Sequence, residues 1–144
     1  MQVTLFSDYA LRMLMYLGVR PDEVVPISQI AEAFGASRHY MLKVMNDLTE
    51  AGYITAVRGR RGGVKLAKAP ADIRVGKLVK ATEPHEGLLD CIPGGSDCPI
   101  EAVCKLRKIF IEAQAEFYRT LDNYTVADLI AQPKKLQRIL LKQA

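Results

Sequence analysis

The order of apolar and polar residues predicts a mainly α-helical chain that begins with an amphipathic helix. Over residues 4–20 the apolar side chains recur at helical spacing, and Pro21 follows as a typical helix end. The positions that define this face are Leu5, Phe6, Tyr9, Met13, Tyr16 and Leu17. We expect this face to pack into the core of the first folded unit.

Two shorter helices follow, joined by a turn that contains glycine. Ser28 can cap the first, QIAEAF, and Gly35 stands where a left-handed residue would end it. Ser37 can cap the second, RHYMLKVMNDLTEA, and Gly52 ends it in the same way. Two helices joined by a short turn with glycine are typical of a helix-turn-helix.

The period then changes from helix to strand. YITAV and VKLA are short β-type segments, and RGRRGG between them predicts a tight turn. A helix-turn-helix followed at once by a basic hairpin predicts a winged helix, whose second helix enters the major groove of DNA while the wing contacts the backbone or the minor groove. The residues expected to contact DNA are Ser37, Arg38, His39 and Lys43 on the second helix, with Arg58, Arg60 and Arg61 on the wing.

A second unit follows, whose main element is a long helix. From residue 100 to residue 121 apolar residues recur at alternating threes and fours, which is the narrow seam of a helix that packs on another helix. The seam consists of Ile100, Val103, Leu106, Phe110, Ala113, Phe117 and Leu121. Asp97 or Cys98 can cap this helix because Pro99 suits its first turn. We expect its partner to be the same helix of a second subunit, since the chain offers no other long helix of this kind. Thr125 with Asp128 resembles the capping box of a short helix beyond it.

Charge and composition narrow the classes of partner. The 144 residues carry a net charge of +4, and the stretch from Arg58 to Lys68 holds five basic residues and no acidic one. Such concentration favours a polyanionic partner, double-stranded DNA in this context. The first residues lack the pattern of a signal peptide and no apolar run is long enough to span a bilayer, so we expect a cytoplasmic protein that does not enter a membrane.

The three cysteines, Cys91, Cys98 and Cys104, lie within one short segment, CIPGGSDCPIEAVC. A disulfide would leave one thiol over and fits poorly with the cytoplasm. Structural zinc favours closer cysteine pairs, whereas an iron–sulfur cluster accepts ligands spread over a longer loop. The spacing therefore favours a cluster over zinc, and direct thiol sensing stays an alternative. His85 and Asp8 are both candidates for a fourth ligand, and the residues alone do not choose between them.

The opening QVTLFSDYALRMLMYL, the segment from Ser37 to Lys68, the cysteine segment ending in CKLR and the stretch LDNYTVADLI resemble the iron–sulfur winged-helix repressors over essentially the whole chain. The opening and LDNYTVADLI resemble their nitric-oxide-sensing branch. In the cluster-assembly regulators of this family a histidine just after the third cysteine completes the site, and here Arg107 stands in that region. The resemblance implies that Asp8 of the partner subunit is the fourth ligand of a 4Fe–4S cluster, with a 2Fe–2S cluster as the alternative.

The resemblance implies a homodimeric repressor that responds to nitric oxide and controls genes of nitric oxide detoxification. We expect a winged helix-turn-helix domain over residues 1–80, a cluster-binding loop over 81–98, and a dimerisation helix with C-terminal helices over 99–144. We do not expect an enzyme, because no acid–base constellation accompanies the thiols. The alternative is a cluster-free winged-helix regulator whose cysteines sense oxidants or hold structural zinc.

Overall fold

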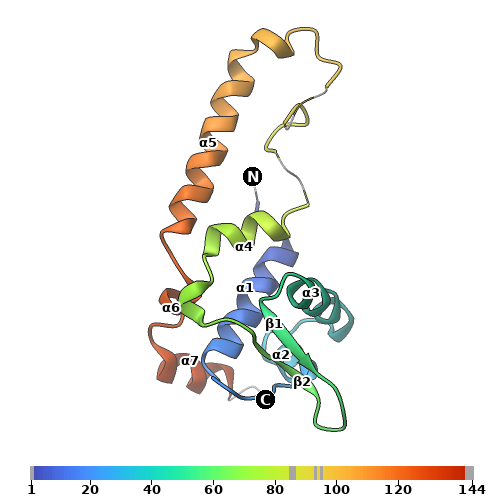
Figure 1. Ribbon diagram of the computed structural model, residues 1–144, viewed down its shortest axis with the longest axis vertical. Coiled ribbons are helices and arrows are strands. Elements are labelled where there is room, and N and C mark those ends of the chain that lie inside the picture. Colours follow the sequence, from blue (N-terminus) through green and yellow to red (C-terminus); the bar gives the residue numbers. More distant parts are fainter. Residues whose placement is uncertain (1, 85–86, 93, 95, 142–144) are drawn as a thin grey trace.

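A computed structural model describes residues 2–84, 87–92, 94 and 96–141 of the chain. Figure 1 shows a body built from both ends of the sequence and a long arm that projects from it. The arm consists of α5 and the described residues that precede it from residue 87 onward. The helices are α1 (Leu5–Gly18), α2 (Ile27–Ala33), α3 (Arg38–Glu50), α4 (Val75–Thr82), α5 (Lys105–Asp122), α6 (Val126–Leu129) and α7 (Pro133–Leu140); the strands are β1 (Ile54–Val57) and β2 (Gly63–Leu66). The mainly helical fold class is confirmed. No helix in these ranges is long and apolar enough to cross a membrane.

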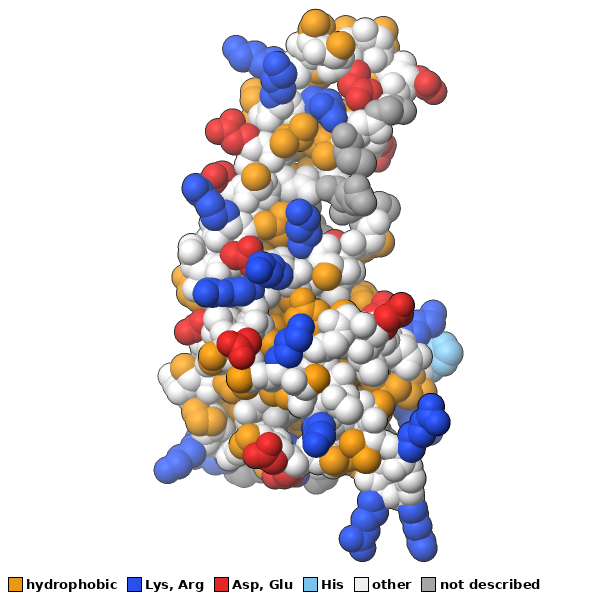
Figure 2. All heavy atoms as spheres, in the orientation of Figure 1, with side chains coloured by type: hydrophobic (Ala, Val, Ile, Leu, Met, Phe, Trp, Pro, Cys, Tyr) orange, Lys and Arg blue, Asp and Glu red, His pale blue; other side chains and the backbone are white. Residues whose placement is uncertain are grey.

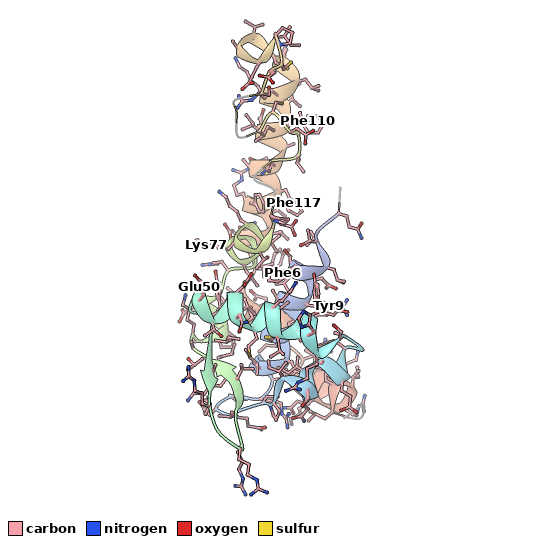
Figure 3. All side chains as sticks on the ribbon, turned by 90° about the vertical axis from the view of Figure 1, so that its right-hand side faces the viewer. Phe6, Tyr9, Glu50, Lys77, Phe110 and Phe117 are labelled. Atoms are coloured by element: carbon pink, nitrogen blue, oxygen red, sulfur yellow. The ribbon has the colours of Figure 1, made fainter. Side chains whose placement is uncertain are left out.

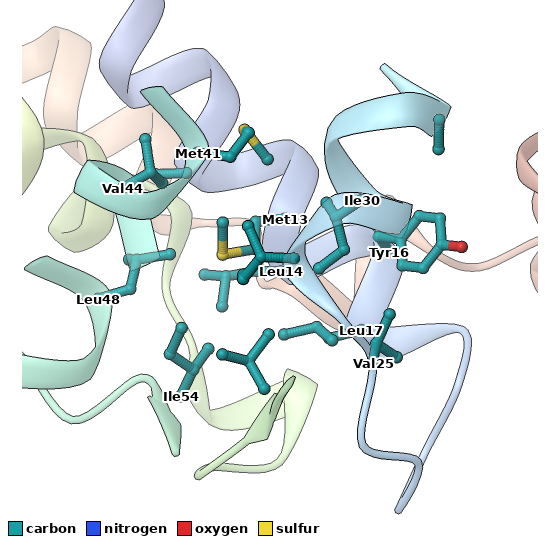
Figure 4. Close-up of a cluster of buried hydrophobic side chains, with 14 of the residues drawn as sticks. Met13, Leu14, Tyr16, Leu17, Val25, Ile30, Met41, Val44, Leu48 and Ile54 are labelled. Atoms are coloured by element: carbon teal, nitrogen blue, oxygen red, sulfur yellow. The ribbon is translucent and has the colours of Figure 1, made fainter. Parts of the chain in front are cut away.

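The core of the body lies between α1, the helix pair α2 and α3, and the small sheet. Met13, Leu14 and Ile30 are fully buried, and Met41 and Ile54 face them from α3 and β1 (Figure 4). Burial of one such side chain stabilises a fold by roughly 1.5–3 kcal/mol. The predicted apolar face of the first helix accounts for much of this core, although Leu5 itself is exposed.

The helix pair differs from the prediction at one cap. Ser37 caps α3 as predicted, since its hydroxyl accepts a hydrogen bond from the Tyr40 amide at 3.1 Å. Ser28 does not cap α2: the cap position is Pro26, which offers no side-chain hydrogen bond. The buried Ile27 already begins the helix, so Ser28 lies inside the first turn. Gly35 and Gly52 both adopt positive φ angles, of 60° and 73°, as the predicted helix ends require.

The hairpin is held to the body by a third extended segment. β1 and β2 pair antiparallel, with Ile54 opposite Leu66 and Val57 opposite Gly63. Val25 and Val64 exchange backbone hydrogen bonds of 2.9 and 2.8 Å. Gly63 is required at this crossing, because a Cβ atom there would lie 2.3 Å from the Val25 carbonyl oxygen. The base of the wing is therefore rigid relative to α1 and α2.

The cap predicted for the long helix is wrong. A single 3₁₀ turn covers Glu101–Val103, and α5 begins only at Lys105 with Cys104 as its cap residue. The backbone of Cys104 is extended, which separates the turn from the helix. Neither Asp97 nor Cys98 therefore caps α5. The capping box of Thr125 and Asp128 is confirmed at the start of α6.

The end of α5 returns to the body through α6 and α7. Val126 is buried, and its amide donates to the Ile73 carbonyl oxygen at 3.0 Å. α6 contacts α1, and Leu140 of α7 reaches the core. α4 contacts both α1 and α5, so it is the element through which the arm rests on the body.

Candidate functional site

The exposed face of α3 carries the side chains predicted to read DNA. Arg38, His39 and Lys43 are all exposed, as are Asn46 and Asp47 further along the same helix. The Ser37 hydroxyl points back to the helix backbone as its cap, so it fixes the start of α3. The predicted exposed face is thus present, with its basic residues in the first half of the helix, where a recognition helix contacts base edges.

The wing presents its arginines at the tip of the hairpin. Arg58, Arg60 and Arg61 are exposed, and Figure 2 shows basic side chains projecting from the end of the molecule where the hairpin lies. The turn is tight: the Gly62 amide donates to the Gly59 carbonyl oxygen at 2.9 Å, and a Cβ at Gly62 would lie 2.5 Å from the Val57 carbonyl oxygen. In Figure 3, α3 runs across one face and the hairpin hangs below it, so both elements are available to one duplex.

An aromatic cluster behind α3 sets its position, and the pattern of the sequence did not reveal it. The Tyr40 ring of α3 meets Tyr9 edge-on at 5.7 Å and Phe6 at 6.3 Å between ring centroids. The guanidinium of Arg12 lies over the rings of Tyr9 and Phe34, at 5.8 and 5.7 Å. Edge-to-face and cation–π contacts add to simple burial. The first half of α1 therefore packs directly against α3 and fixes its position.

Asp8 lies in this same half of α1 and is paired with a neighbour. Its carboxylate contacts the Arg12 guanidinium through Oδ2 at 2.8 Å and Oδ1 at 2.9 Å. Both side chains are substantially exposed, so the pair is only weakly stabilising. Figure 1 shows α1 inside the body and the cysteine segment beside the far end of α5. The structure does not bring Asp8 together with the cysteines of its own chain.

The three cysteines lie on the arm as free thiols. Cys91 and Cys104 are half-buried, and Cys98 is exposed. Within the described ranges, no three histidine, cysteine or acidic side chains are gathered around one point as they are around a metal ion. His85, the other candidate ligand, lies outside the described residues. The described residues of one chain thus supply three thiols on one segment, but they do not form a complete metal site.

Arg107 joins the first and the third cysteine. Its guanidinium Nε donates to the Cys91 carbonyl oxygen at 2.9 Å, and its amide donates to the Cys104 sulfur at 3.4 Å. Glu101 lies 3.9 Å from the same guanidinium and accepts a hydrogen bond from the Ser96 amide at 2.9 Å. These contacts fold the segment back onto α5. Sequence reasoning identified Arg107 only as a replacement for a histidine and missed this bridging role.

The donor set of the segment fits an iron–sulfur cluster. Thiolates are the usual protein ligands of such clusters, and a cluster with three cysteines leaves one iron for a different ligand. The same thiols could hold zinc with one further donor. Arg107 holds the backbone of Cys91 and the sulfur of Cys104 near the start of α5, so both residues are positioned by the same side chain and its own amide.

Comparison with solved structures shows the same fold. The structure of CymR, the global cysteine regulator of B. subtilis, superposes with a TM-score of 0.71 at 21% identity and covers 91% of this chain and 97% of that chain. The structure of T. potens IscR gives a TM-score of 0.72 at 24% identity, over 95% of this chain and 91% of that chain. The oxidized form of Staphylococcus aureus CymR gives 0.70 at 24% identity, over 90% and 95%. These likenesses confirm the winged-helix fold.

The family follows from the sequence as a whole. The Rrf2 family, described as iron-dependent transcriptional regulators, matches residues 3–132, which include α1, the helix-turn-helix, the wing, the cysteine segment and α5. This is a family of DNA-binding regulators and not of enzymes. The chain therefore belongs to the Rrf2 family of transcriptional regulators.

Proposed function

We propose that the chain is a homodimeric repressor that senses nitric oxide through an iron–sulfur cluster and controls genes of nitric oxide detoxification, as the nitric-oxide-sensitive repressor NsrR does. The observation that carries the proposal is the placement of three free thiols on an arm, away from the surface suited to DNA. A sensor needs its reactive groups apart from the operator contacts and mechanically connected to them. The body binds DNA through α3 and the wing, and the arm responds to the signal.

Cys91, Cys98 and Cys104 would hold the cluster, with Asp8 of the partner subunit as the fourth ligand. Two observations support this set of ligands. Arg107 occupies the region where cluster-assembly regulators carry a histidine, and it is engaged with the backbone of Cys91. The Asp8 side chain on α1 is 39% exposed, so a second subunit can reach it. A 4Fe–4S cluster suits three thiolates and one weaker ligand, and a 2Fe–2S cluster is the alternative.

The carboxylate gives the site a reactive corner. When bound, the cluster supplies iron that combines with nitric oxide. Asp8 holds that corner with a hard oxygen donor, which binds iron less firmly than thiolate and exchanges more readily. As a ligand, Asp8 would link the α1 helix of one subunit to the cysteine segment of the other. Two half-sites on DNA require the two α3 helices to keep a fixed spacing. Release of Asp8 would remove the link that maintains this spacing.

Exposed apolar residues on the arm support the dimer. None of the 18 residues of α5 is buried, and Leu106 and Ile109 are more than half exposed. Apolar side chains that stay exposed together on one face of a helix mark a protein interface. A second α5 packed along this face would bury them and bring two bodies to one operator.

A cluster-free regulator is the second candidate, and one observation favours it. Solved structures of CymR, one of them an oxidized form, share this fold. Cys98 is an exposed thiol, so it is accessible to oxidants. In that case the three cysteines would act by thiol chemistry or hold structural zinc, and the response to nitric oxide would be absent.

Anaerobic purification of the full chain tests the proposal. We expect a coloured protein with broad visible absorption and with both iron and sulfide bound. Added nitric oxide should bleach this absorption and release an operator selected from a pool of random DNA. A colourless protein that contains zinc, or one that leaves DNA only on thiol oxidation, would support the second candidate instead.

A further inference from the structure

A partly buried carboxylate, that of Glu83, joins the start of α1 to the end of α4. Oε1 of Glu83 accepts three hydrogen bonds: from the Thr4 amide at 2.9 Å, from the Thr4 hydroxyl at 2.9 Å and from the Ser7 hydroxyl at 2.6 Å. Hydrogen bonds to an ionised acceptor are stronger than neutral ones. We call this set of contacts the Glu83 clamp.

The Glu83 clamp completes the first turn of α1 from a distance. Thr4 is the cap residue, and its hydroxyl accepts from the Ser7 amide at 3.3 Å. In a capping box, the third residue of the helix returns a hydrogen bond to the cap amide through a long acidic or amide side chain. Ser7 holds that position but is too short to reach back. Glu83, 79 residues after Thr4, supplies the missing carboxylate.

The clamp is closed to water around Ser7. Ser7 is fully buried, and its oxygen lies 2.7 Å from the hydroxyl oxygen of Thr82 as well as beside Glu83. The Thr82 hydroxyl donates in turn to the Leu78 carbonyl oxygen at 3.0 Å. Buried polar groups of this kind tolerate only a narrow range of positions, because each must keep a partner. The end of α4 and the start of α1 therefore move together.

The clamp lies next to Asp8 in α1 and at the end of α4 that leads to the cysteine segment. Asp8 directly follows Ser7 in α1. Glu83 is the cap residue at the end of α4, from which the chain continues to the cysteine segment. Before that segment, the Leu88 amide donates to Oε1 of Gln114 on α5 at 3.1 Å. Glu83 therefore connects the start of α1, which carries Asp8, to the point where the chain leaves α4 toward the cysteine segment.

We infer that Glu83 is a positioning residue of the sensor. Its carboxylate fixes Asp8 of α1 relative to the end of α4, from which the chain leads to the cysteine segment, and transmits the state of the arm to the body. This inference rests on the proposed function. Because Asp8 serves the partner's cysteines, each clamp connects the loop of one cluster site to the ligand of the other. The two sites of a dimer are thereby coupled.

Hydrogen exchange on the metal-free full chain tests the clamp without the cluster. Glu83→Ala should raise amide exchange at residues 4–8 by at least about tenfold, the effect of losing a charge-assisted hydrogen bond, and leave the second half of α1 unchanged. Glu83→Gln keeps an acceptor oxygen and should retain most of the protection. Glu23→Ala, which removes an exposed carboxylate elsewhere on the body, is the matched control.

The second readout is the ratio of operator affinities with and without the cluster. Glu83→Ala should still bind iron, and its metal-free form should bind DNA like the wild type. The ratio of its operator affinities with and without the cluster should fall toward one. Glu83→Gln should keep a ratio near that of the wild type. The inference is overturned if Glu83→Ala keeps both the exchange protection and the ratio, or if the Gln variant loses the ratio as fully as the Ala variant. A wild-type chain without a chromophore overturns the proposed function itself, and its own spectrum distinguishes that case.

Discussion

The body and the arm of this chain differ in how far their apolar side chains are buried. In the body, Met13, Leu14 and Met41 are fully buried among side chains of their own chain. On the arm, Val103 is 79% exposed, Leu106 57% and Ile109 53%. Exposed apolar surface costs roughly 25 cal/mol for each Å². The body buries its apolar side chains within one chain, whereas the arm leaves apolar side chains exposed, as the proposed dimer interface requires.

The same contrast holds for the polar groups. The Ser7 hydroxyl and the Glu83 carboxylate of the body are satisfied within the chain. The thiols of Cys91, Cys98 and Cys104 are free, and Asp8 has only an exposed partner, Arg12. Groups with incomplete local partners are those that ligands and second subunits can use. Under the proposed function, the body supplies stability and the arm supplies the response to the signal.

The largest expected effect comes from removing one thiol of the arm. Cys98→Ala should abolish the chromophore and the bound iron, because two thiolates are too few to hold the cluster. Since Cys98 is exposed, the free energy of unfolding of the metal-free chain should change by less than about 0.5 kcal/mol. Iron analysis and thermal unfolding of the same preparation measure the two quantities. Full iron content in this variant would break the distinction between arm and body.

The dimer is the next target. Ile109→Glu should give monomers in sedimentation experiments, because two like charges would meet in the apolar interface of α5. The matched control is Ala115→Glu, which adds the same charge at an exposed position on the polar side of α5, one turn before Arg119. A dimeric Ile109→Glu variant would show that the two subunits meet elsewhere.

Phe117 belongs to the predicted seam, which Ile109 does not, but it is a less suitable target. It is half-buried and lines a cavity of about 200 Å³ together with Val79 and Tyr118 (Figure 3 shows its place next to α4). A charge at this position would disturb the contact of the arm with the body as well as the dimer.

In the body, two kinds of substitution should weaken DNA binding differently. Arg60→Ala on the wing should lower affinity for every sequence and reduce the slope of log affinity against log salt by about one, because one phosphate contact is lost. Lys43→Ala or His39→Ala on α3 should change the preference among base pairs by about 1–3 kcal/mol at the contacted position. Binding titrations at several salt concentrations separate the two. Lys108→Ala on the arm should change neither the salt dependence nor the preference among base pairs. Equal effects of the substitutions on α3, the wing and the arm would contradict the assignment of base contacts to α3 and phosphate contacts to the wing.

The smallest expected effect concerns the junction of the arm with the body. Hydrogen bonds from the Thr125 amide and hydroxyl lower the pKa of Asp128 below its ordinary value of 3.8. A lowered pKa in the folded state stabilises the protein above the ordinary pKa, and this contribution is lost as the pH falls through the folded-state value. Asp128→Asn should therefore lower the thermal midpoint slightly at neutral pH. The difference from the wild type should vanish in acid, and a difference that grew in acid would contradict this role.

The sequence predicted the body well because its signals are local. Apolar periodicity, the Ser37 cap and the glycines at 35 and 52 each act within a few residues, and all are present in the structure. Ser28 is not the cap because Ile27, the residue before it, is buried and already belongs to the helix. Such a shift of two residues, from Ser28 to Pro26, depends on packing, which a local pattern does not contain.

The arm was less predictable because its contacts are distant in sequence. The start of α5 depends on a 3₁₀ turn and on the Arg107 bridge to Cys91, sixteen residues away. The Glu83 clamp spans 79 residues and shows no short-range pattern. The cysteine ligands and Asp8 are still a prediction, since the site needs a second subunit to close.

The most direct test of the account is a mixed dimer that divides one site between two chains. One chain carries Asp8→Ala with all its cysteines, and the other carries Cys98→Ala with its Asp8. If the partner subunit supplies the aspartate, the mixed dimer contains one complete site, and that site should react with nitric oxide at the wild-type rate with half the iron of the wild type. His85→Ala should leave spectrum and reaction rate unchanged in a matched preparation. A mixed dimer that reacts like the Asp8→Ala homodimer, or a chromophore lost with His85→Ala, would contradict the claim that the arm of one subunit is completed by the body of the other.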